Sequence, residues 1–267
     1  MQNLQNKIHS TPLLPIVATV LLAFTQFLTP FFAELTHIGL RIEETANSLP
    51  GTSPETPAGY AFAIWFVIFT LSLIYAVVQA LPSHRQNPVF NQIRPTLAVI
   101  FLLNTVWMLI AQIYGDVWQL ALLITMMTIL SIRVFLQVLS ENMVRHIDKA
   151  SFLLMPLLGL LSGWLSLAVF LNVGAVLKPY FMQTLALTYT DYALSLLIVT
   201  LGLVGWMLFR TKGNLWYGGT ILWGLIAVII ANTEVPNTTV LWTASILSAL
   251  VALALGIFKL RFKSQTA

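Results

Sequence analysis

Apolar residues are gathered into long runs along this chain, and polar or Pro- and Gly-rich segments separate the runs. Each run reaches or approaches the roughly 20 residues that an α-helix needs to cross a bilayer, whereas strands of a membrane barrel alternate over about ten residues. The pattern therefore predicts an all-α polytopic transmembrane bundle of about eight helices. The expected helices are residues 12–35, 58–80, 95–114, 117–139, 151–177, 189–209, 215–232 and 239–260.

The composition supports the same fold class. Of the 267 residues, 58% are hydrophobic and only 8% are charged, whereas soluble domains carry about 25% charged residues. These values exclude a water-soluble enzyme and indicate an integral membrane protein with membrane lipid around it. The first apolar run is longer than a signal-peptide core and has no clear cleavage site, so we expect it to remain as an anchor.

The positive charges predict the orientation. Of the 13 Lys and Arg residues, only Arg41 and Lys178 fall in the connections on one side of the predicted bundle. The other basic residues fall on the opposite side, which is the distribution of cytoplasmic loops. We therefore expect a multi-pass protein of a bacterial inner (cell) membrane with both termini in the cytoplasm. The basic residues form no stripe interleaved with aromatic residues, so no nucleic-acid partner is expected.

Catalytic chemistry is poorly represented in the sequence. No Asp, Glu, Lys or His lies near the middle of a predicted helix, all four His residues fall in connections or the N-terminal tail, and Cys is absent. No HExxH pair or acidic cluster is present to bind a metal. We therefore predict no catalytic residues, no metal site and no required cofactor, and the protein is not expected to be an enzyme, a proton pump or a retinal photoreceptor.

Tryptophan is abundant, with eight residues in the chain. Four of them, Trp118, Trp206, Trp216 and Trp242, lie within about one turn of a helix end, where Trp anchors helices at the level of the lipid headgroups. Trp65 and Trp107 lie about 10 Å below the external ends of their helices, at 1.5 Å per residue, and Trp164 lies deeper. Trp223 is also deep but stands alone.

The three other deep Trp residues share helix faces with aromatic or amide side chains. The stripes are Phe62, Trp65 and Phe69 on the second helix, Asn104 and Trp107 on the third, and Trp164, Ala168 and Asn172 on the fifth. An Asn in hydrocarbon needs hydrogen-bonding partners. The stripes are therefore interpreted either as interhelical packing, with both Asn residues bonded across helices, or as the lining of a ligand pocket.

Three segments resemble the TspO/MBR family, the tryptophan-rich sensory proteins that include the translocator protein. They are Pro57-Ala58-Gly59-Tyr60-Ala61-Phe62-Ala63-Ile64-Trp65, which is similar to the start of the second helix of the family, Leu103-Asn104-Thr105-Val106-Trp107, which is similar to its LNxxW, and the WxSxAxxLN pattern from Trp164 to Asn172. Within these segments the FGPVW of the family is shortened to Phe62-Ala63-Ile64-Trp65, and its following Tyr is Phe69.

The resemblance implies a five-helix core that can form a homodimer and binds porphyrins and other flat lipophilic ligands. It divides the chain into a TspO/MBR-like core at residues 1–180 and three additional helices with a basic tail at 181–267. The ligand-binding residues that it implies are Phe62, Trp65, Asn104, Trp107, Trp164, Ala168 and Asn172. The protein would then act as a sensor, carrier or regulator for a lipophilic small molecule such as a tetrapyrrole or a sterol-like lipid.

Two other functions remain open at the level of sequence. The last three helices could complete the path of a secondary transporter, or the protein could be an intramembrane enzyme that modifies a lipid or pigment. Gly159 and Gly163 form a GxxxG pattern that permits close helix approach, so this face of the fifth helix is a candidate surface for self-association.

Overall fold

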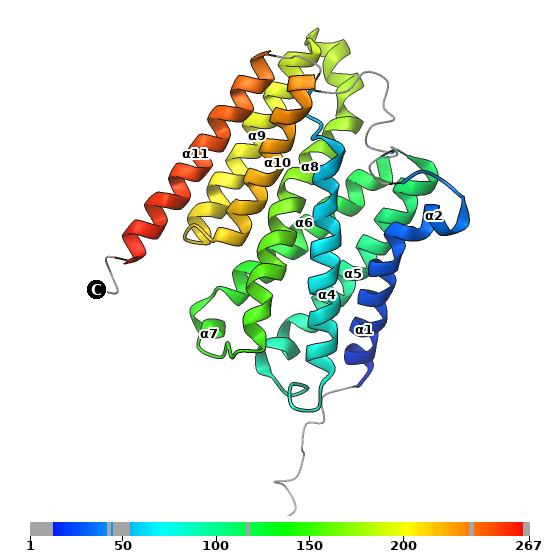
Figure 1. The fold of residues 1–267 in the computed structure, drawn as a ribbon, viewed down its shortest axis with the longest axis vertical. Helices are drawn as coiled ribbons and strands as arrows, with labels where there is room; N and C mark the ends of the chain where they lie inside the picture. The colour runs from blue at the N-terminus through cyan, green and yellow to red at the C-terminus, as the bar shows by residue number, and fades with distance from the viewer. Residues whose placement is uncertain (1–12, 42–43, 45–53, 116–117, 235–237, 264–267) are drawn as a thin grey trace, which may run out of the picture.

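The computed structural model describes residues 13–41, 44, 54–115, 118–234 and 238–263. Eight of its helices or helical segments are long and apolar enough to span a membrane, which confirms the predicted all-α polytopic bundle (Figure 1). The elements are α1 (Leu13–Leu28), η1 (Thr29–Phe31), α2 (Phe32–Thr36), η2 (Gly59–Ala63), α4 (Ile64–Ala80), α5 (Pro88–Tyr114), α6 (Trp118–Val138), α7 (Glu141–Val144), η3 (Ser151–Leu153), α8 (Leu154–Leu185), α9 (Tyr189–Arg210), α10 (Leu215–Glu234) and α11 (Thr238–Lys263).

Two helices extend seven or eight residues beyond their predicted bounds, in both cases across a proline that stands at or near the predicted boundary. α5 begins at Pro88 rather than at residue 95, because the side chain of Asn87 caps its first turn and Pro95 lies within the helix. α8 continues through Pro179 to Leu185 rather than ending at residue 177. Proline costs about 3 kcal/mol inside a helix in water, but helices in membranes tolerate it when neighbouring groups satisfy the backbone.

α8 is the central helix of the bundle. It packs against α4, α6, α9 and α10, while α1 packs against α4 and α5, and α10 packs against α11 (Figure 1). Its most apolar stretch is 67% buried, the largest share among the eight spans. Because α8 crosses the predicted boundary at residue 180 and also holds α10, it connects the predicted core to the three last helices. The division of the chain at that boundary stays a prediction.

The N-terminal helix shows the polarity expected of a membrane span. α1 buries Thr19 and Gln26, which are both 0% exposed, and leaves Leu14 and Leu21 at 79% and 60% exposed. The Thr19 hydroxyl donates to the carbonyl oxygen of Pro15 at 2.7 Å. Polar groups thus face protein and apolar groups face outward, because lipid cannot supply hydrogen bonds.

The structure corrects the placement of one basic residue. The charge pattern places Arg94, with the other basic residues of that side, in a cytoplasmic connection, but Arg94 lies inside α5 and is 2% exposed. Its Nε donates to Oε1 of Gln79 at 2.5 Å, and its Nη1 donates to Oδ1 of Asn91 at 2.6 Å. The earlier start of α5 explains the difference, since it brings Arg94 almost two turns into the helix. Two neutral amides therefore solvate a buried guanidinium at this end of the bundle.

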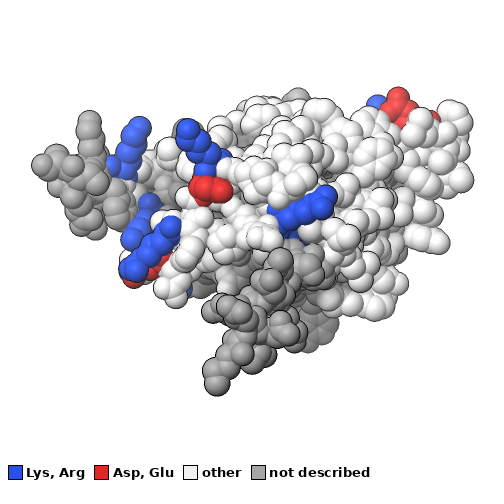
Figure 2. All heavy atoms as spheres, turned by 90° about the horizontal axis from the view of Figure 1, so that it is seen from below, with Lys and Arg blue, Asp and Glu red and all other residues white. Residues whose placement is uncertain are grey.

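The lower end of the bundle in Figure 1 carries the α4–α5 connection and the connection that contains α7. Figure 2 views this end and shows blue Lys and Arg side chains spread over it, with few acidic ones. Arg85, Arg145 and Lys149 belong to these two connections. The arrangement agrees with the charge pattern in the sequence, and the cytoplasmic orientation of this end stays a prediction.

The GxxxG face of α8 is occupied within the chain. A Cβ added to Gly159 would lie 2.5 Å from Cβ of Trp216, and one added to Gly163 would lie 2.8 Å from Cβ of Thr220. Both contacts are with α10, so the prediction that this face mediates self-association is wrong. The homodimer implied by the resemblance stays a prediction and would need another surface.

Candidate functional site

The three deep tryptophans predicted from the sequence meet in one aromatic cluster. The ring centroid of Trp65 lies 5.9 Å from that of Trp107, with the planes at 38°, and 6.3 Å from that of Trp164, with the planes at 85°. Phe62 meets Trp164 edge to face at 5.8 Å, and Phe69 lies 5.2 Å from Trp65. We call Phe62, Trp65, Phe69, Trp107 and Trp164 the aromatic cluster.

Phe62 and Trp65 lie at the junction of a 3₁₀-helix and an α-helix. η2 is a 3₁₀-helix from Gly59 to Ala63 that runs directly into α4. A 3₁₀-helix has three residues per turn, so side chains three positions apart lie one above the other. Phe62 lies near the end of η2 and Trp65 in the first turn of α4, three positions later, and both rings meet Trp164 of α8.

The two predicted amides are bonded between helices, as the packing interpretation requires. Trp107 donates its Nε1 hydrogen to Oδ1 of Asn172 at 3.3 Å, and Asn172 in turn donates from Nδ2 to the carbonyl oxygen of Ala168 at 2.9 Å. Asn104 donates from Nδ2 to Oε1 of Gln26 in α1 at 3.3 Å. Gln26 was not predicted as part of the site, although a lone Gln in the first apolar run was a detectable signal.

Several polar atoms in and beside the cluster are buried without a hydrogen-bond partner among the described residues. They are Nε1 of Trp65, Nε1 of Trp164, Oδ1 of Asn104 and Nε2 of Gln26. An unsatisfied buried donor or acceptor costs about 1–3 kcal/mol, and the large majority of buried side-chain polar atoms in native proteins have a partner in the protein or in ordered water. The site therefore has hydrogen-bonding capacity that its own side chains do not use.

The cluster is closed in this structure. The side chains of Trp65, Trp107 and Trp164 are 2%, 5% and 3% exposed. A flat ring stacked between two indoles needs their planes about 7 Å apart, at about 3.5 Å per contact. Trp65 and Trp107 would therefore have to move apart by about 1 Å and become more parallel to admit a planar ligand, with neighbouring side chains giving way at its edges.

Helix α10 contributes contacts that sequence reasoning missed. Trp223 does not stand alone as predicted, because its Nε1 donates to the carbonyl oxygen of Ala61 at 3.0 Å and its ring meets Tyr60 edge to face at 5.2 Å. A Cβ added to Gly224 would lie 3.9 Å from Cζ3 of Trp164. The spacing pattern missed this because the partners of Trp223 lie on η2, 162 residues earlier in the chain.

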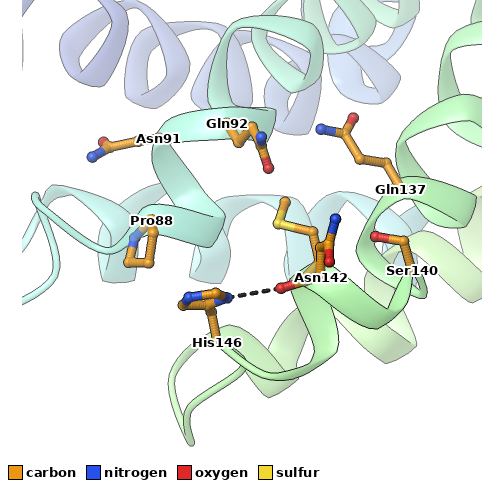
Figure 3. A pocket seen from close by; sticks show the side chains of 8 residues that line it. Pro88, Asn91, Gln92, Gln137, Ser140, Asn142 and His146 are labelled. Atoms are coloured by element: carbon orange, nitrogen blue, oxygen red, sulfur yellow. Dashed lines mark hydrogen bonds between the residues drawn. The ribbon is translucent and has the colours of Figure 1, made fainter.

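A hollow lies at the end of the bundle that is predicted to be cytoplasmic (Figure 3). Its volume is about 540 Å³, and its lining comprises Pro88, Asn91, Gln92, Gln137, Ser140, Asn142, Met143 and His146. Nδ1 of His146 donates to the carbonyl oxygen of Asn142 at 2.8 Å, as drawn in Figure 3. Six of the eight lining residues have polar side chains, and no Trp, Tyr or Phe lines the hollow. The aromatic cluster is therefore the candidate site for a flat lipophilic ligand.

The five members of the aromatic cluster are Phe and Trp residues, which carry no ionisable group. His84 and His146 are in connections, and His9 lies outside the described residues. In the connection before α8, hydrogen bonds from the hydroxyl and the backbone amide of Ser151 lower the pKa of the Asp148 carboxyl. Within the described part of the chain, no group of three or more His, Asp or Glu side chains could hold a metal ion.

The eight spans and the buried intramembrane cluster define a polytopic membrane protein with an aromatic core. A family model described as "TSPO-like protein" matches residues 14–257. The chain therefore belongs to the TSPO-like protein family, and the match extends over all eight spans, including the three helices beyond the expected core. Comparisons with curated proteins and with solved structures each gave no match.

Proposed function

We propose that this TSPO-like membrane protein binds a flat, conjugated lipophilic ligand within the aromatic cluster and acts as its sensor, carrier or regulator rather than as an enzyme. A tetrapyrrole is the first candidate, and a sterol-like lipid is the second. The observation that carries the proposal is the combination of three indoles from three helices with two buried indole N–H groups that lack a partner among the described residues.

The chemistry of the cluster supports a ligand that is both flat and able to accept hydrogen bonds. Indole faces stack on conjugated rings, and such contacts contribute about 0.5–1.5 kcal/mol each beyond the burial of area. The N–H groups of Trp65 and Trp164 are donors only, so a ligand that satisfies them must supply lone pairs. Asn104 and Gln26 add one unused acceptor and one unused donor beside the indoles, and none of these groups carries a charge.

The competing interpretation is that the cluster only packs the helices together. Single substitutions that keep bulk distinguish the two, namely Trp65→Phe, Trp164→Phe and Asn104→Leu, with Trp242→Phe as the control because Trp242 is 63% exposed on α11. Each variant is purified into lipid nanodiscs, and its affinity for protoporphyrin IX and its thermal stability are measured side by side.

A binding role predicts that each of the three site variants loses about tenfold in affinity, which is about 1.4 kcal/mol. Their folds should stay largely intact, and the control should match wild type. Lower stability without any selective loss of affinity would support packing alone.

A further inference from the structure

The segment that leads into the aromatic cluster is attached to α10 by hydrogen bonds. The backbone amide of Ala58 donates to the carbonyl oxygen of Ala227 at 3.0 Å. Nδ2 of Asn232 donates to the carbonyl oxygen of Pro54 at 2.7 Å. With the bond from Trp223 to Ala61, described above, three hydrogen bonds join residues 54–61 to one helix.

The three α10 residues that make these bonds are spread along the helix, and at 3.6 residues per turn Asn232 lies about half a turn round it from Trp223. Trp223 and Ala227 are four residues apart, and Asn232 follows five residues later, so the contacts run along α10 for more than two turns. Asn232 also donates to the carbonyl oxygen of Val228 at 2.9 Å, which holds its amide against its own helix. The attachment is therefore spread along the segment rather than concentrated at one point.

The attached segment carries part of the aromatic cluster. Residues 54–63, which we call the gate segment, include Phe62, whose ring meets Trp164, and they continue into α4, which carries Trp65. Displacement of this segment away from α10 would withdraw Phe62 from Trp164. Because the three indoles are almost fully buried, some such movement has to precede the arrival of a ligand.

On these grounds we infer that α10 is the element that controls access to the aromatic cluster, by holding the gate segment closed through Trp223, Ala227 and Asn232. This inference rests on the proposed function, because α10 can control ligand exchange only if the aromatic cluster binds a ligand. It assigns a role to a helix outside the expected five-helix core. Trp223 and Asn232 are positioning residues in this scheme, because they act on the gate segment and not on the ligand.

Two variants remove the side-chain bonds while keeping bulk. Trp223→Phe loses the N–H group and keeps a ring against Tyr60, and Asn232→Leu loses the amide. The matched controls are Trp242→Phe on α11 and Thr233→Val, since Thr233 is exposed beside Asn232 and donates only to Ile230 of its own helix. Unchanged helicity and elution volume of each variant establish that it is folded.

The first readout needs no ligand. Backbone hydrogen exchange of peptides that cover residues 54–63, measured in nanodiscs, should be at least tenfold faster in the Trp223→Phe/Asn232→Leu double variant than in wild type or the controls. The second readout is the rate of protoporphyrin IX exchange by stopped-flow fluorescence. Association and dissociation should both accelerate about tenfold, with the dissociation constant unchanged within about threefold, because the bonds form in the closed state whether or not a ligand is inside.

A crosslink tests the opposite change, in which the gate segment is held against α10 instead of being released. The chain contains no Cys, so Ala58→Cys/Ala227→Cys places the only two thiols at the backbone contact between the gate segment and α10. Oxidation should slow both ligand rates and reduce the quenching of buried Trp by acrylamide, and dithiothreitol should restore both. The single Cys variants serve as controls for the substitutions themselves.

The outcomes separate the two proposals. If hydrogen exchange of residues 54–63 is unchanged in the double variant, the inference is overturned. It is also overturned if hydrogen exchange is faster but the rates of ligand association and dissociation are unaltered. If wild type binds no tetrapyrrole or sterol, the proposed function fails. The role of α10 would then be judged on hydrogen exchange and acrylamide quenching, and it would be overturned if neither responds to the double variant or the crosslink.

Discussion

Gly163→Ala is the substitution whose effect follows most directly from the packing of α8 on α10. A Cβ at this position would lie 2.8 Å from Cβ of Thr220 and 2.9 Å from the carbonyl oxygen of Tyr217. Carbon atoms pack favourably at about 3.5–4.0 Å, so the two helices must separate locally by several tenths of an ångström or more. Overpacking of this kind costs about 1–3 kcal/mol.

Part of this cost is offset by the helix itself. Alanine is favoured over glycine in a helix interior by about 1 kcal/mol in host peptides, so the net loss expected for Gly163→Ala is about 1 kcal/mol. The Gly159→Ala/Gly163→Ala double variant should lose about twice as much or more, because Gly159 is even closer to Trp216. Gly202→Ala in α9 is the matched control, since no atom lies within 4 Å of its added Cβ.

Unfolding in mixed micelles by titration with sodium dodecyl sulfate measures these differences, and size-exclusion chromatography with light scattering reports the mass of the particle. We expect Gly163→Ala to unfold at lower denaturant, Gly202→Ala to be unchanged or more stable, and all three proteins to have the same mass. Gly163→Ala as stable as Gly202→Ala would refute the packing argument. A loss of oligomer mass in Gly163→Ala would restore the GxxxG face as an interface between chains.

Three further predictions concern the ends of the bundle. Gln79→Leu removes the acceptor of the bond from Nε of Arg94 and should lower the free energy of unfolding by about 1.5–3 kcal/mol, as bonds to charged groups do; a change below about 0.5 kcal/mol in the same titration would contradict this. Hydrogen bonds from Ser151 lower the pKa of Asp148 in the folded protein, so this contribution to stability is complete above the unfolded pKa of about 3.9 and is lost as the pH falls through the lower folded value. Acidification below pH 4 should therefore lower the thermal stability of wild type more than that of Ser151→Ala. Parallel pH profiles of the two proteins would contradict the role given to the Ser151–Asp148 hydrogen bonds. Reporter fusions after Lys263 and within residues 44–56 should be cytoplasmic and external respectively, and the opposite location at either site would overturn the predicted topology.

The architecture was predictable because bilayer thickness fixes the length of a spanning helix. The apolar runs predict the number and order of the spans, and the largest errors lie at the ends where proline was overestimated as a stop, at Pro95 and Pro179. Arg94 was misplaced for the same reason. Its burial depends on Gln79 of the preceding helix, and no feature near residue 94 in the sequence indicates that partner.

The candidate site was predictable to the extent that it follows helix periodicity. Helix periodicity predicts the stripes on η2 and α4, on α5 and on α8, and each of the three stripes contributes rings to the cluster. Contacts between distant segments were not predictable in this way. The bond from Trp223 to Ala61 and the pairing of Asn104 with Gln26 depend on how helices are placed beside one another.

The central claim is that the aromatic cluster binds a planar lipophilic molecule, and equilibrium titration of wild-type protein in nanodiscs with protoporphyrin IX tests it most directly. Tryptophan fluorescence should fall saturably to one ligand per chain, and a non-quenching analogue should displace the ligand and restore the emission. Nanodiscs of the Trp65→Phe/Trp164→Phe variant provide the reference for porphyrin that has merely dissolved in lipid. Quenching that rises linearly without saturation, and equally in wild type and variant, would contradict a binding site in the cluster.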